Sequence, residues 1–372
     1  MIAAMQRDTQ IVHAGFRAPT QPGAFLAGPQ FSSTYTTPGD PSEHALTYGR
    51  YHNPTWSAWE EALGVLEGGQ AITFASGMAA VGAVLGVTLR RGDVLVLPSD
   101  CYYNVRSLAA TWLESLGVEI RQVPTRDMAR SSVLDGARVI WIETPSNPQL
   151  DVCDIGAVVD TARTRNAIVV VDNTTATPYL QRPLELGATY VVASDTKAIS
   201  GHSDLVLGHV ATTDAERATQ LRQWRNIHGS IPGPMEVWLA HRSLPTLPLR
   251  VTRQCATAAQ LAEMLANRRD VAGAYYPGLP SHPGHEIASR QMQAFGSLVS
   301  FDLATRARAD RFLRALTLVR EATSFGGVHS IAERRARWGG DAISEGFIRF
   351  SVGCEAAADV LGDVEQALNA TA

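Results

Sequence analysis

Short runs of apolar, largely β-branched residues alternate with helix-like segments in the first half of the chain, and this alternation limits the possible folds more than any other feature. The apolar runs are Ala71-Ile-Thr-Phe-Ala, Asp93-Val-Leu-Val-Leu, Arg138-Val-Ile-Trp-Ile, Ala167-Ile-Val-Val-Val and Thr189-Tyr-Val-Val-Ala, and the helix-like segments cover about 77–90, 104–116 and 155–165. Strands that are apolar along their whole length are typical of parallel sheets with helices on both faces. We therefore predict an α/β fold with a mostly parallel sheet, whose ligands bind at the carboxyl ends of the strands.

The two ends of the chain differ from this central part. Residues 1–49 have weak periodicity and many Gly, Pro, Ser and Thr residues, which predicts an extended N-terminal arm. Beyond Gly229-Ser-Ile-Pro-Gly-Pro the pattern changes to a long helical stretch, interrupted by prolines, and then to strand-like segments and helices: 235–269, 297–303, 307–318, 347–352 and 355–369. We therefore predict a large domain at 50–244 and a smaller α+β domain at 245–372.

Composition and charge exclude several classes of protein. The chain has 372 residues, 45% of them hydrophobic and 18% charged, and a formal net charge of -4. These values are typical of a globular protein with a large core, and neither nucleic acid nor a membrane is an expected partner. No apolar stretch approaches the ~20 residues of a membrane helix, and the first residues lack the pattern of a signal peptide. The cysteines lack the spacing of metal ligands and are interpreted as reduced thiols of a cytoplasmic protein: Cys101, Cys153, Cys255 and Cys354.

Lysine is almost absent from this chain. Of its 32 basic residues only Lys197 is a lysine, and the others are arginines. Codon bias explains most of this pattern, but arginine stays protonated, whereas a desolvated lysine can form a Schiff base. Lys197 follows an apolar run directly, with the hydroxyl residues Ser194 and Thr196 before it and a Gly-rich turn after it. A solvated surface lysine is the alternative, and we favour a Schiff-base role.

Two other predicted strands also end in polar residues. Ser76 and Gly77 begin a helix whose free backbone N–H groups suit a phosphate, although Ser76 could simply cap that helix. Asp172 ends the run before the one that precedes Lys197. A carboxylate at this position can bind a metal, cap the next helix or pair with a cationic heteroatom. No neighbouring His/Asp cluster supports a metal.

Two more polar residues are candidates for binding a substrate carboxylate. Asn147 lies in the rigid turn Glu143-Thr-Pro-Ser-Asn-Pro, and Arg349 lies on the apolar strand Ile348-Arg-Phe-Ser-Val. Burial of Arg349 requires an anionic partner, which is either a substrate carboxylate or a structural Asp or Glu. A lysine, a phosphate site, a carboxylate and an aromatic side chain are what pyridoxal 5′-phosphate (PLP) needs. The sequence therefore predicts PLP as the cofactor, and no metal ion.

Nearly end to end, the sequence resembles the PLP-dependent enzymes of Cys/Met metabolism, which implies the aspartate aminotransferase fold (fold type I). The similarity rests on motifs in one order: Thr9-Gln-Ile-Val-His-Ala-Gly, Phe31-Ser-Ser-Thr-Tyr, Tyr48-Gly-Arg-Tyr-His-Asn-Pro-Thr, Ser76-Gly-Met-Ala-Ala, Glu143-Thr-Pro-Ser-Asn-Pro, Val171-Asp-Asn-Thr, Ser194-Asp-Thr-Lys-Ala-Ile-Ser-Gly-His-Ser-Asp, Ser324-Phe-Gly-Gly-Val-His-Ser and Ile348-Arg-Phe-Ser-Val-Gly. Within this family the sequence resembles the cystathionine γ-lyases most closely, in a group that also includes γ-synthases and methionine γ-lyases.

The resemblance implies a role for each matching residue. Lys197 forms the Schiff base and moves protons, and Asp172 pairs with the pyridine nitrogen. The residues expected to hold the phosphate are Gly77, Met78, Ser194 and Thr196, joined by Tyr48 and Arg50 of a neighbouring subunit. This sharing of sites implies a homo-oligomer, expected to be a tetramer built as a dimer of dimers. The large domain at 50–244 is then the PLP-binding domain, and the arm at 1–49 contributes to the neighbouring subunit's site.

The remaining roles concern the ring and the substrate. Tyr102 is expected to stack on the cofactor ring and to act as acid or base, although Tyr103 follows it where many relatives have glycine. The residues expected to position the substrate are Asn147, Arg349, Ser330 and His329. His202 is expected to order its loop rather than to react.

Departures from the family pattern concern substrate choice. His329 stands where relatives that act on cystathionine often carry Glu, and it cannot offer the same fixed negative charge. The segment Glu333-Arg-Arg-Ala-Arg-Trp is also unusual, because Arg334, Arg335 and Arg337 form either a solvated face or a site for a second acidic group. We do not expect these changes to alter the class of reaction.

The sequence thus predicts a PLP-dependent lyase that eliminates a γ-substituent from a small-molecule amino-acid substrate. The leading prediction is cystathionine γ-lyase activity, which converts cystathionine to cysteine, 2-oxobutanoate and ammonia. Alternatives with the same fold are a γ-eliminating or γ-replacing enzyme of specialised metabolism acting on a modified or halogenated amino acid, a cystathionine γ-synthase and a methionine γ-lyase. A non-catalytic PLP-binding protein is disfavoured, because Lys197, Asp172, Tyr102 and Arg349 are all present.

Overall fold

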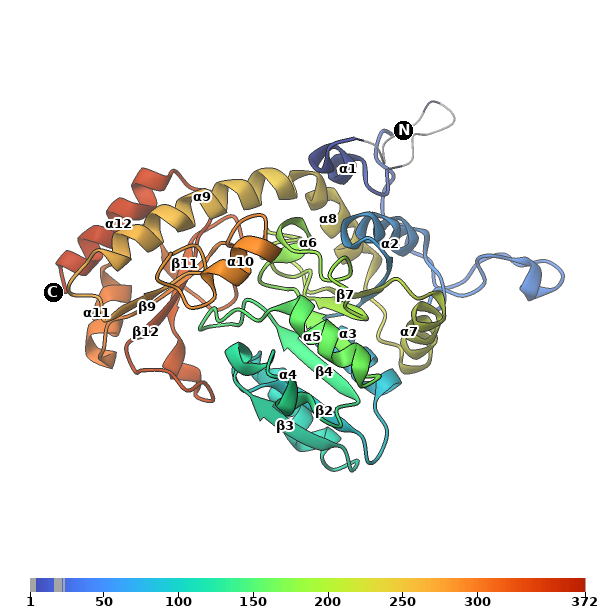
Figure 1. Ribbon diagram of the computed structural model, residues 1–372. Helices are drawn as coiled ribbons and strands as arrows, with labels where there is room; N and C mark the ends of the chain where they lie inside the picture. Colours follow the sequence, from blue (N-terminus) through green and yellow to red (C-terminus); the bar gives the residue numbers. More distant parts are fainter. Residues whose placement is uncertain (1–4, 17–21, 23, 372) are drawn as a thin grey trace.

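A computed structural model describes residues 5–16, 22 and 24–371, which form two sheets with helices around them (Figure 1). The larger sheet has seven strands in the order β1-β7-β6-β5-β4-β2-β3. Its strands are β1 (Gln70–Phe74), β2 (Val94–Pro98), β3 (Glu119–Val123), β4 (Val139–Glu143), β5 (Ile168–Asp172), β6 (Tyr190–Ala193) and β7 (Gly208–Thr212). The smaller sheet has the order β10-β11-β12-β9-β8 and consists of β8 (Gly273–Tyr275), β9 (Leu298–Asp302), β10 (Arg320–Glu321), β11 (Ile331–Arg334) and β12 (Phe347–Ser351).

Helices cover both faces of the larger sheet and one side of the smaller one (Figure 1). They are α1 (Arg7–His13), α2 (Pro54–Glu67), α3 (Gly77–Thr88), α4 (Tyr103–Leu108), α5 (Ile155–Thr164), α6 (Thr177–Leu180), α7 (Ala215–His228), α8 (Pro234–Ser243), α9 (Leu247–Ala266), α10 (His285–Gln291), α11 (Arg306–Ala315) and α12 (Ala357–Asn369). Among the residues that the structure describes, no helix is both long and apolar enough to cross a membrane.

The predicted apolar runs all lie in the larger sheet, with β1 at one edge of it. They correspond to β1, β2, β4, β5 and β6, and the last four of these pair in parallel through β2·β4, β4·β5 and β5·β6. Along β5, Val170 belongs to the core beneath α3 and α7, whereas Val169 and Val171 belong to the core beneath α5. Burial on both faces is the physical reason why these strands lack polar positions, and the α/β prediction is confirmed.

Two strands of the larger sheet were not predicted from the sequence. β7 is antiparallel to both β1 and β6, and its sequence Gly208-His-Val-Ala-Thr interrupts the apolar pattern with a buried histidine. β3 lies at the edge of the sheet and consists of exposed and half-buried residues, so it resembles a polar segment. An edge strand is solvated on one side, and its pattern is correspondingly weaker.

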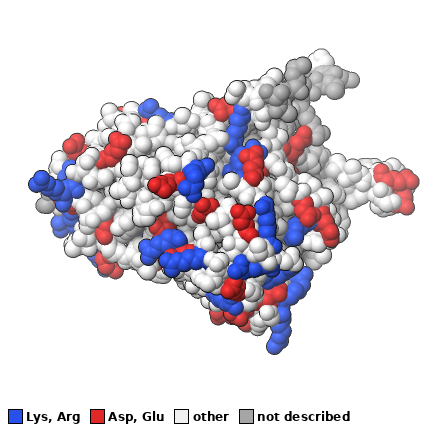
Figure 2. Space-filling view, viewed as in Figure 1, with Lys and Arg blue, Asp and Glu red and all other residues white. Residues whose placement is uncertain are grey.

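The N-terminal arm is only partly extended. Contrary to the prediction, α1 is helical, and Ile11 is buried in a core shared with α2 and α8. The loop that contains the short 3-10 helix Pro41–Glu43 does extend away from the body of the protein (Figure 1). Acidic and basic side chains are interspersed on the face shown in Figure 2.

The long helical stretch of the second half is divided where its prolines stand. α8 ends at Ser243, a 3-10 turn covers Leu244–Thr246, and α9 starts at Leu247. The predicted domain boundary at residue 245 falls in this turn, and the division at 50–244 and 245–372 stays a prediction. One core joins α9, α11, α12 and the smaller sheet, including Phe301 and Phe312, whose rings meet edge to face at 5.5 Å.

This core predicts the effect of a truncation. Phe301 is fully buried, so Phe301→Ala should lower the free energy of unfolding by about 3–5 kcal/mol, measured by urea denaturation. Leu318→Ala in the same part of the chain removes a side chain that is 40% exposed and should change it much less. Equal losses in the two variants would contradict this account of the core.

Candidate active site

A cavity of about 390 Å³ lies where the strands of the larger sheet end, facing the C-terminal part of the chain. Residues that directly follow β4, β5 and β6 line it, as predicted for a parallel sheet. The structure brings together most of the predicted site residues: Gly77, Met78, Tyr102, Asn147, Asp172, Ser194, Thr196, Lys197 and Arg349. Their sequence separations are large, so only the fold places them in one cavity.

Lys197 is a half-buried amine in this cavity. Its Nζ donates a hydrogen bond to Ser324 Oγ at 2.9 Å and lies 5.3 Å from the centroid of the Phe325 ring. Burial and the neighbouring positive charge of Arg349 lower the pKa of Lys197 to about 8, although Asp172 and Glu333 act in the opposite direction. Lys197 therefore lines the cavity instead of standing on the outer surface, and its Schiff-base role stays a prediction. A buried amine with this pKa is partly deprotonated near neutral pH and can act as a nucleophile or a base.

Asp172 and Glu143 are buried carboxylates on adjacent strands. They stand opposite each other in the register of β4 and β5. Burial raises the pKa of Asp172, while hydrogen bonds from Thr174 and the charges of His209 and Lys197 oppose this change. Asp172 Oδ1 accepts from Thr174 N at 3.0 Å and from Thr174 Oγ1 at 2.6 Å. Asp172 thus orders the turn after β5 and also lines the cavity.

Glu143 is a site residue to which sequence reasoning assigned no role. Burial and the charge of Asp172 raise its pKa well above the usual range. Its two oxygens accept from the backbone N–H groups of Tyr102, at 2.6 Å, and Asn147, at 2.9 Å. One carboxylate therefore fixes the backbone at two other cavity residues. In the sequence, the position of Glu143 at the end of an apolar run was the feature that could have identified it as a site residue.

The start of α3 has the properties of an anion site. Ser76 does cap this helix, since its Oγ accepts from Ala79 N at 3.1 Å. Gly77 and Met78, the two residues between them in the chain, line the cavity. A Cβ atom on Gly77 would lie 2.9 Å from Ser194 Cβ, so glycine is required for this close approach. The two alternatives for Ser76 and Gly77 are therefore compatible.

Arg349 and Asn147 form the opposite wall of the cavity. Arg349 is fully buried on β12, and its Nη1 donates to Asn147 Oδ1 at 2.9 Å. Its Nη2 donates to Ser324 O at 2.7 Å and forms an ion pair with Glu333. Burial lowers the pKa of Arg349 to about 10, and the charge of Glu333 opposes this shift. Arg349 thus has a structural anion in Glu333 and also lines the cavity, and its binding of a substrate carboxylate stays a prediction.

Tyr102, and not Tyr103, lines the cavity. Tyr102 is 41% exposed, and its hydroxyl accepts a hydrogen bond from Asn104 Nδ2 at 2.9 Å. Tyr103 lies outside, where Gly340 approaches its ring. This placement supports Tyr102 as the residue that stacks on the cofactor.

Ser330 and His329 do not line the cavity. Ser330 is buried elsewhere: its Oγ donates to Glu355 at 2.8 Å and accepts from Gly353 N at 2.9 Å. His329 is exposed. The hydroxyl that lies beside Lys197 belongs to Ser324, which sequence reasoning missed although it begins the quoted motif. The expectation that Ser330 and His329 contact the substrate is therefore not supported by their positions in this chain.

Tyr48 and Arg50 lie away from this cavity. Arg50 bonds to Asn226 O, and its guanidinium lies over the rings of Tyr48 and Tyr51, at 5.5 Å and 4.8 Å. His202 contacts its own loop through Ser200 O at 2.6 Å, in agreement with an ordering role. The four cysteines are free thiols, and the described part of the chain contains no group of three or more His, Cys, Asp or Glu residues that could hold a metal.

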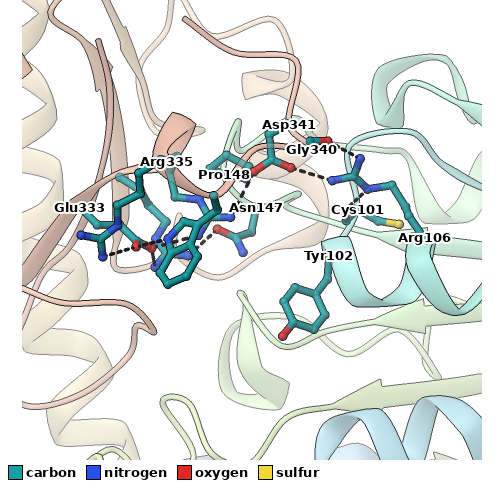
Figure 3. Close-up of polar contacts among 12 residues, drawn as sticks. Cys101, Tyr102, Arg106, Asn147, Pro148, Glu333, Arg335, Gly340 and Asp341 are labelled. Carbon is teal, nitrogen blue, oxygen red and sulfur yellow. Dashed lines mark hydrogen bonds and ion pairs between the residues drawn. The ribbon is translucent and has the colours of Figure 1, made fainter. Parts of the chain in front are cut away.

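Of the arginines at 334, 335 and 337, only Arg337 is exposed to solvent. Arg334 is buried and pairs with Asp310 and Glu345. Arg335 lines the cavity, and Arg337 pairs with Glu321 and Glu333. The buried carboxylate of Glu333 holds Arg335 (Figure 3) and Arg337, and it also accepts from Trp338 and Arg349.

Comparison with known proteins identifies the family. Residues 8–369 match the family described as Cys/Met metabolism PLP-dependent enzymes. The chain belongs to this family. A Streptomyces coelicolor protein provisionally named cystathionine gamma-lyase is 53% identical over 98% of this chain and 93% of its own length. The cystathionine gamma-synthase of Mycobacterium tuberculosis is 41% identical over 97% of this chain and 96% of its length.

Solved structures show the same architecture in this family of enzymes. The crystal structure of metB from Corynebacterium glutamicum has a TM-score of 0.95 and 37% identity, and covers 100% of this chain and 99% of that chain. The expected fold type I is thereby confirmed, and PLP is the cofactor of the family. The cavity fits this cofactor, because it combines a buried amine, a buried carboxylate and the glycine-dependent anion site at α3.

The pKa of Lys197 predicts how the apoenzyme takes up its cofactor. Only the deprotonated amine attacks an aldehyde, so the rate of reconstitution with PLP should rise with pH and level off above a midpoint near 8. Arg349→Gln removes a positive charge that lowers this pKa, so it should move the midpoint upward. Absorbance of the attached cofactor measures both rates. A midpoint near the usual value of 10.5 in the unaltered protein would contradict the assignment.

Proposed function

We propose that this enzyme catalyses PLP-dependent γ-elimination, with cystathionine as substrate. In this reaction cystathionine and one water molecule give cysteine, 2-oxobutanoate and ammonia. The observation that carries the proposal is one cavity that holds the Lys197 amine beside Arg349 and Asn147, a pair suited to a substrate carboxylate. The provisional name of the Streptomyces coelicolor relative supports the choice of substrate.

The residues toward the cofactor have complementary roles in this proposal. Lys197 is the residue to which the cofactor attaches. Asp172 pairs with the nitrogen of the cofactor ring, and two observations support this role: Asp172 lines the cavity, and its carboxylate is held by Thr174. The phosphate is held by Gly77, Met78, Ser194 and Thr196, and Tyr102 lies on the ring. When bound, PLP withdraws electrons from the substrate α-carbon and so acidifies its neighbouring C–H bonds.

The proton transfers fall to Lys197. Its lowered pKa would let it accept a proton from the α-carbon and, once it has passed that proton to the cofactor, accept one from the β-carbon, after which the γ-substituent would leave. Ser324 Oγ, which accepts a hydrogen bond from Nζ, positions the amine. Arg349 and Asn147 hold the substrate carboxylate, and Tyr102 supplies or accepts a proton at the leaving group.

Replacement of the γ-substituent is the second candidate, which would make the enzyme a γ-synthase. The observation that favours it is the 41% identity to the mycobacterial cystathionine gamma-synthase over almost the whole chain. Elimination and replacement share every step up to loss of the γ-substituent and differ in whether a nucleophile then adds. A methionine gamma-lyase of Pseudomonas deceptionensis is 38% identical, and a modified or halogenated amino acid would use the same steps.

We further propose a homotetramer, built as a dimer of dimers with shared active sites, in the cytoplasm. Two features of the arm support the sharing: Phe25 and Phe31 are 79% and 69% exposed, and Tyr48 and Arg50 lie outside the cavity of their own chain. Apolar side chains at this exposure are suited to a partner surface. The free thiols support a reducing compartment.

A substrate panel tests the proposed reaction. The holoenzyme should release 2-oxobutanoate and ammonia from cystathionine, and should form cystathionine from an O-acylhomoserine and cysteine only if replacement is the reaction. Arg349→Ala should lower kcat/KM by roughly 30- to 160-fold, because a charged hydrogen bond of ~2–3 kcal/mol is lost. Arg121→Ala alters an exposed ion pair and should leave kcat/KM unchanged. No 2-oxo acid from any γ-substituted amino acid would overturn the proposal.

Hybrid oligomers test whether the sites are shared. Lys197→Ala and Arg50→Ala should each abolish or strongly reduce activity when they are the only chains present. If Arg50 serves the neighbouring subunit, a mixed dimer contains one site with both residues intact, so co-expression should restore about a quarter of the sites. Absence of recovery in hybrids of confirmed composition would show that Arg50 serves its own chain.

A further inference from the structure

Three ionisable side chains form a buried cluster behind the cavity. His209 lies on β7, with its Nδ1 2.6 Å from Asp195 Oδ1 and its Nε2 3.0 Å from Glu67 Oε1. The side chains of all three residues are fully buried, and none of them lines the cavity that holds Lys197. A histidine with a carboxylate at each ring nitrogen is therefore enclosed within the fold.

The two carboxylates favour the charged form of the ring. An ionised carboxylate only accepts hydrogen bonds, and a neutral imidazole has a single N–H, so only the imidazolium can donate to both carboxylates. Burial disfavours this charged form, but the charges and hydrogen bonds of Asp195 and Glu67 more than offset burial and raise the pKa of His209 to about 10. At neutral pH, His209 is therefore a cation inside the protein.

Asp195 links this cation to the lysine of the cavity. It lies two residues before Lys197, in the turn that follows β6. The residue between them, Thr196, is also held from the start of β7, because its Oγ1 accepts from Leu207 N at 2.9 Å. The two residues that precede Lys197 are thus fixed by neighbouring positions, Leu207 and His209. The buried cation therefore helps to set the course of the turn that carries the amine.

His209 is also close to Asp172 in the sheet. Because β7 is antiparallel to β6, its first residues lie at the edge where β5 and β6 end. Asp172 pairs with Val192 on β6, and the next residue of β6, Ala193, pairs with His209. Two strand spacings, or about 10 Å, therefore separate the backbones of Asp172 and His209. Burial raises the pKa of Asp172, and the positive charge of His209 opposes this rise.

The other charged groups around the cluster act on its partners. Arg7 on α1 interacts with Glu67, whereas Lys197 and Glu143 interact with Asp172. The cluster itself has one positive charge between two negative ones. Removal of the positive charge and removal of a negative charge therefore have opposite effects on the electrostatic potential at Asp172.

We propose that His209 is a positioning residue of the active site, which anchors the turn before Lys197 through Asp195 and stabilises the anionic form of Asp172. An anionic Asp172 favours a proton on the ring nitrogen of the cofactor, and a protonated ring withdraws electrons more strongly. This inference rests on the proposed pairing of Asp172 with the ring nitrogen, and it is independent of the γ-substituent that the enzyme removes.

Two variants that break the same hydrogen bond test this role. His209→Gln removes the positive charge of the cluster, and Glu67→Gln removes a negative one. In the holoenzyme, the absorbance of the cofactor reports the pH at which the Schiff-base nitrogen loses its proton, without turnover. Positive charges at His209 and on the ring both disfavour that proton, so His209→Gln should raise this pH by about one unit. Glu67→Gln should leave it unchanged or lower it. A purely structural disturbance would move both variants in the same direction, so shifts of equal sign, or no shift in His209→Gln, would overturn the inference.

Asp172→Asn shows whether the charge acts through Asp172. If it does, His209→Gln should cause a much smaller shift in the Asp172→Asn background than in the unaltered enzyme. A shift of the same size in both backgrounds would contradict action through Asp172. If Asp172→Asn alone leaves the absorbance and its pH dependence unchanged, the proposed pairing with the ring nitrogen fails as well. Failure of the enzyme to eliminate any γ-substituent would overturn only the proposed reaction.

Nitrogen-15 NMR of histidine-labelled enzyme tests the charge of His209 directly and needs no folded variant. One histidine should keep protons on both ring nitrogens at about pH 9, where an ordinary histidine with a pKa near 6.5 is neutral. Its signals should be absent from His209→Gln. If every histidine of the unaltered enzyme is neutral at that pH, the inference is wrong.

Discussion

The buried carboxylate of Glu333 is the interaction on which the C-terminal wall of the active site depends. Its side chain is fully buried and accepts from Arg335, Arg337, Trp338 and Arg349. Burial alone would raise the pKa of Glu333, but Arg349, Trp338 and Arg335 more than offset this and hold it below its usual value. Glu333 and Arg349 are partners in the register of β11 and β12, so the backbone pairing itself brings the two charges together.

The opposite wall is organised by carboxylates at strand ends. Asp172 and Glu143 are neighbours across β5 and β4, and burial raises the pKa values of both. Burial has the reverse effect on Lys197, whose pKa falls to about 8. Burial thus disfavours the charged form of acids and bases alike, and the positive charges of His209 and Lys197 oppose the rise in the pKa of Asp172. The site combines these opposing shifts in one small volume.

The two walls meet through contacts that are distant in sequence. Asn147 and Arg349 bond at 2.9 Å, Lys197 bonds to Ser324 at 2.9 Å, and Ser300 Oγ donates to Pro148 O at 2.7 Å. Each of these contacts joins the part of the chain around the larger sheet to the part around the smaller one. A substrate bound between them contacts groups from both, which explains why neither part contains a complete site.

Some features of this protein follow from its sequence alone. Continuous apolar strands require burial on both faces, and parallel strands bring their carboxyl ends to one edge, so Asp172, Ser194 and Lys197 could be grouped without coordinates. The only lysine of the chain then identified the candidate amine. Ser324, Ser330 and Arg335 could not be sorted in this way, because the segment around them has no periodicity that distinguishes cavity from core. Only the tertiary structure decided their roles: Glu355 binds Ser330 away from the cavity, while Glu333 directs Arg335 into it.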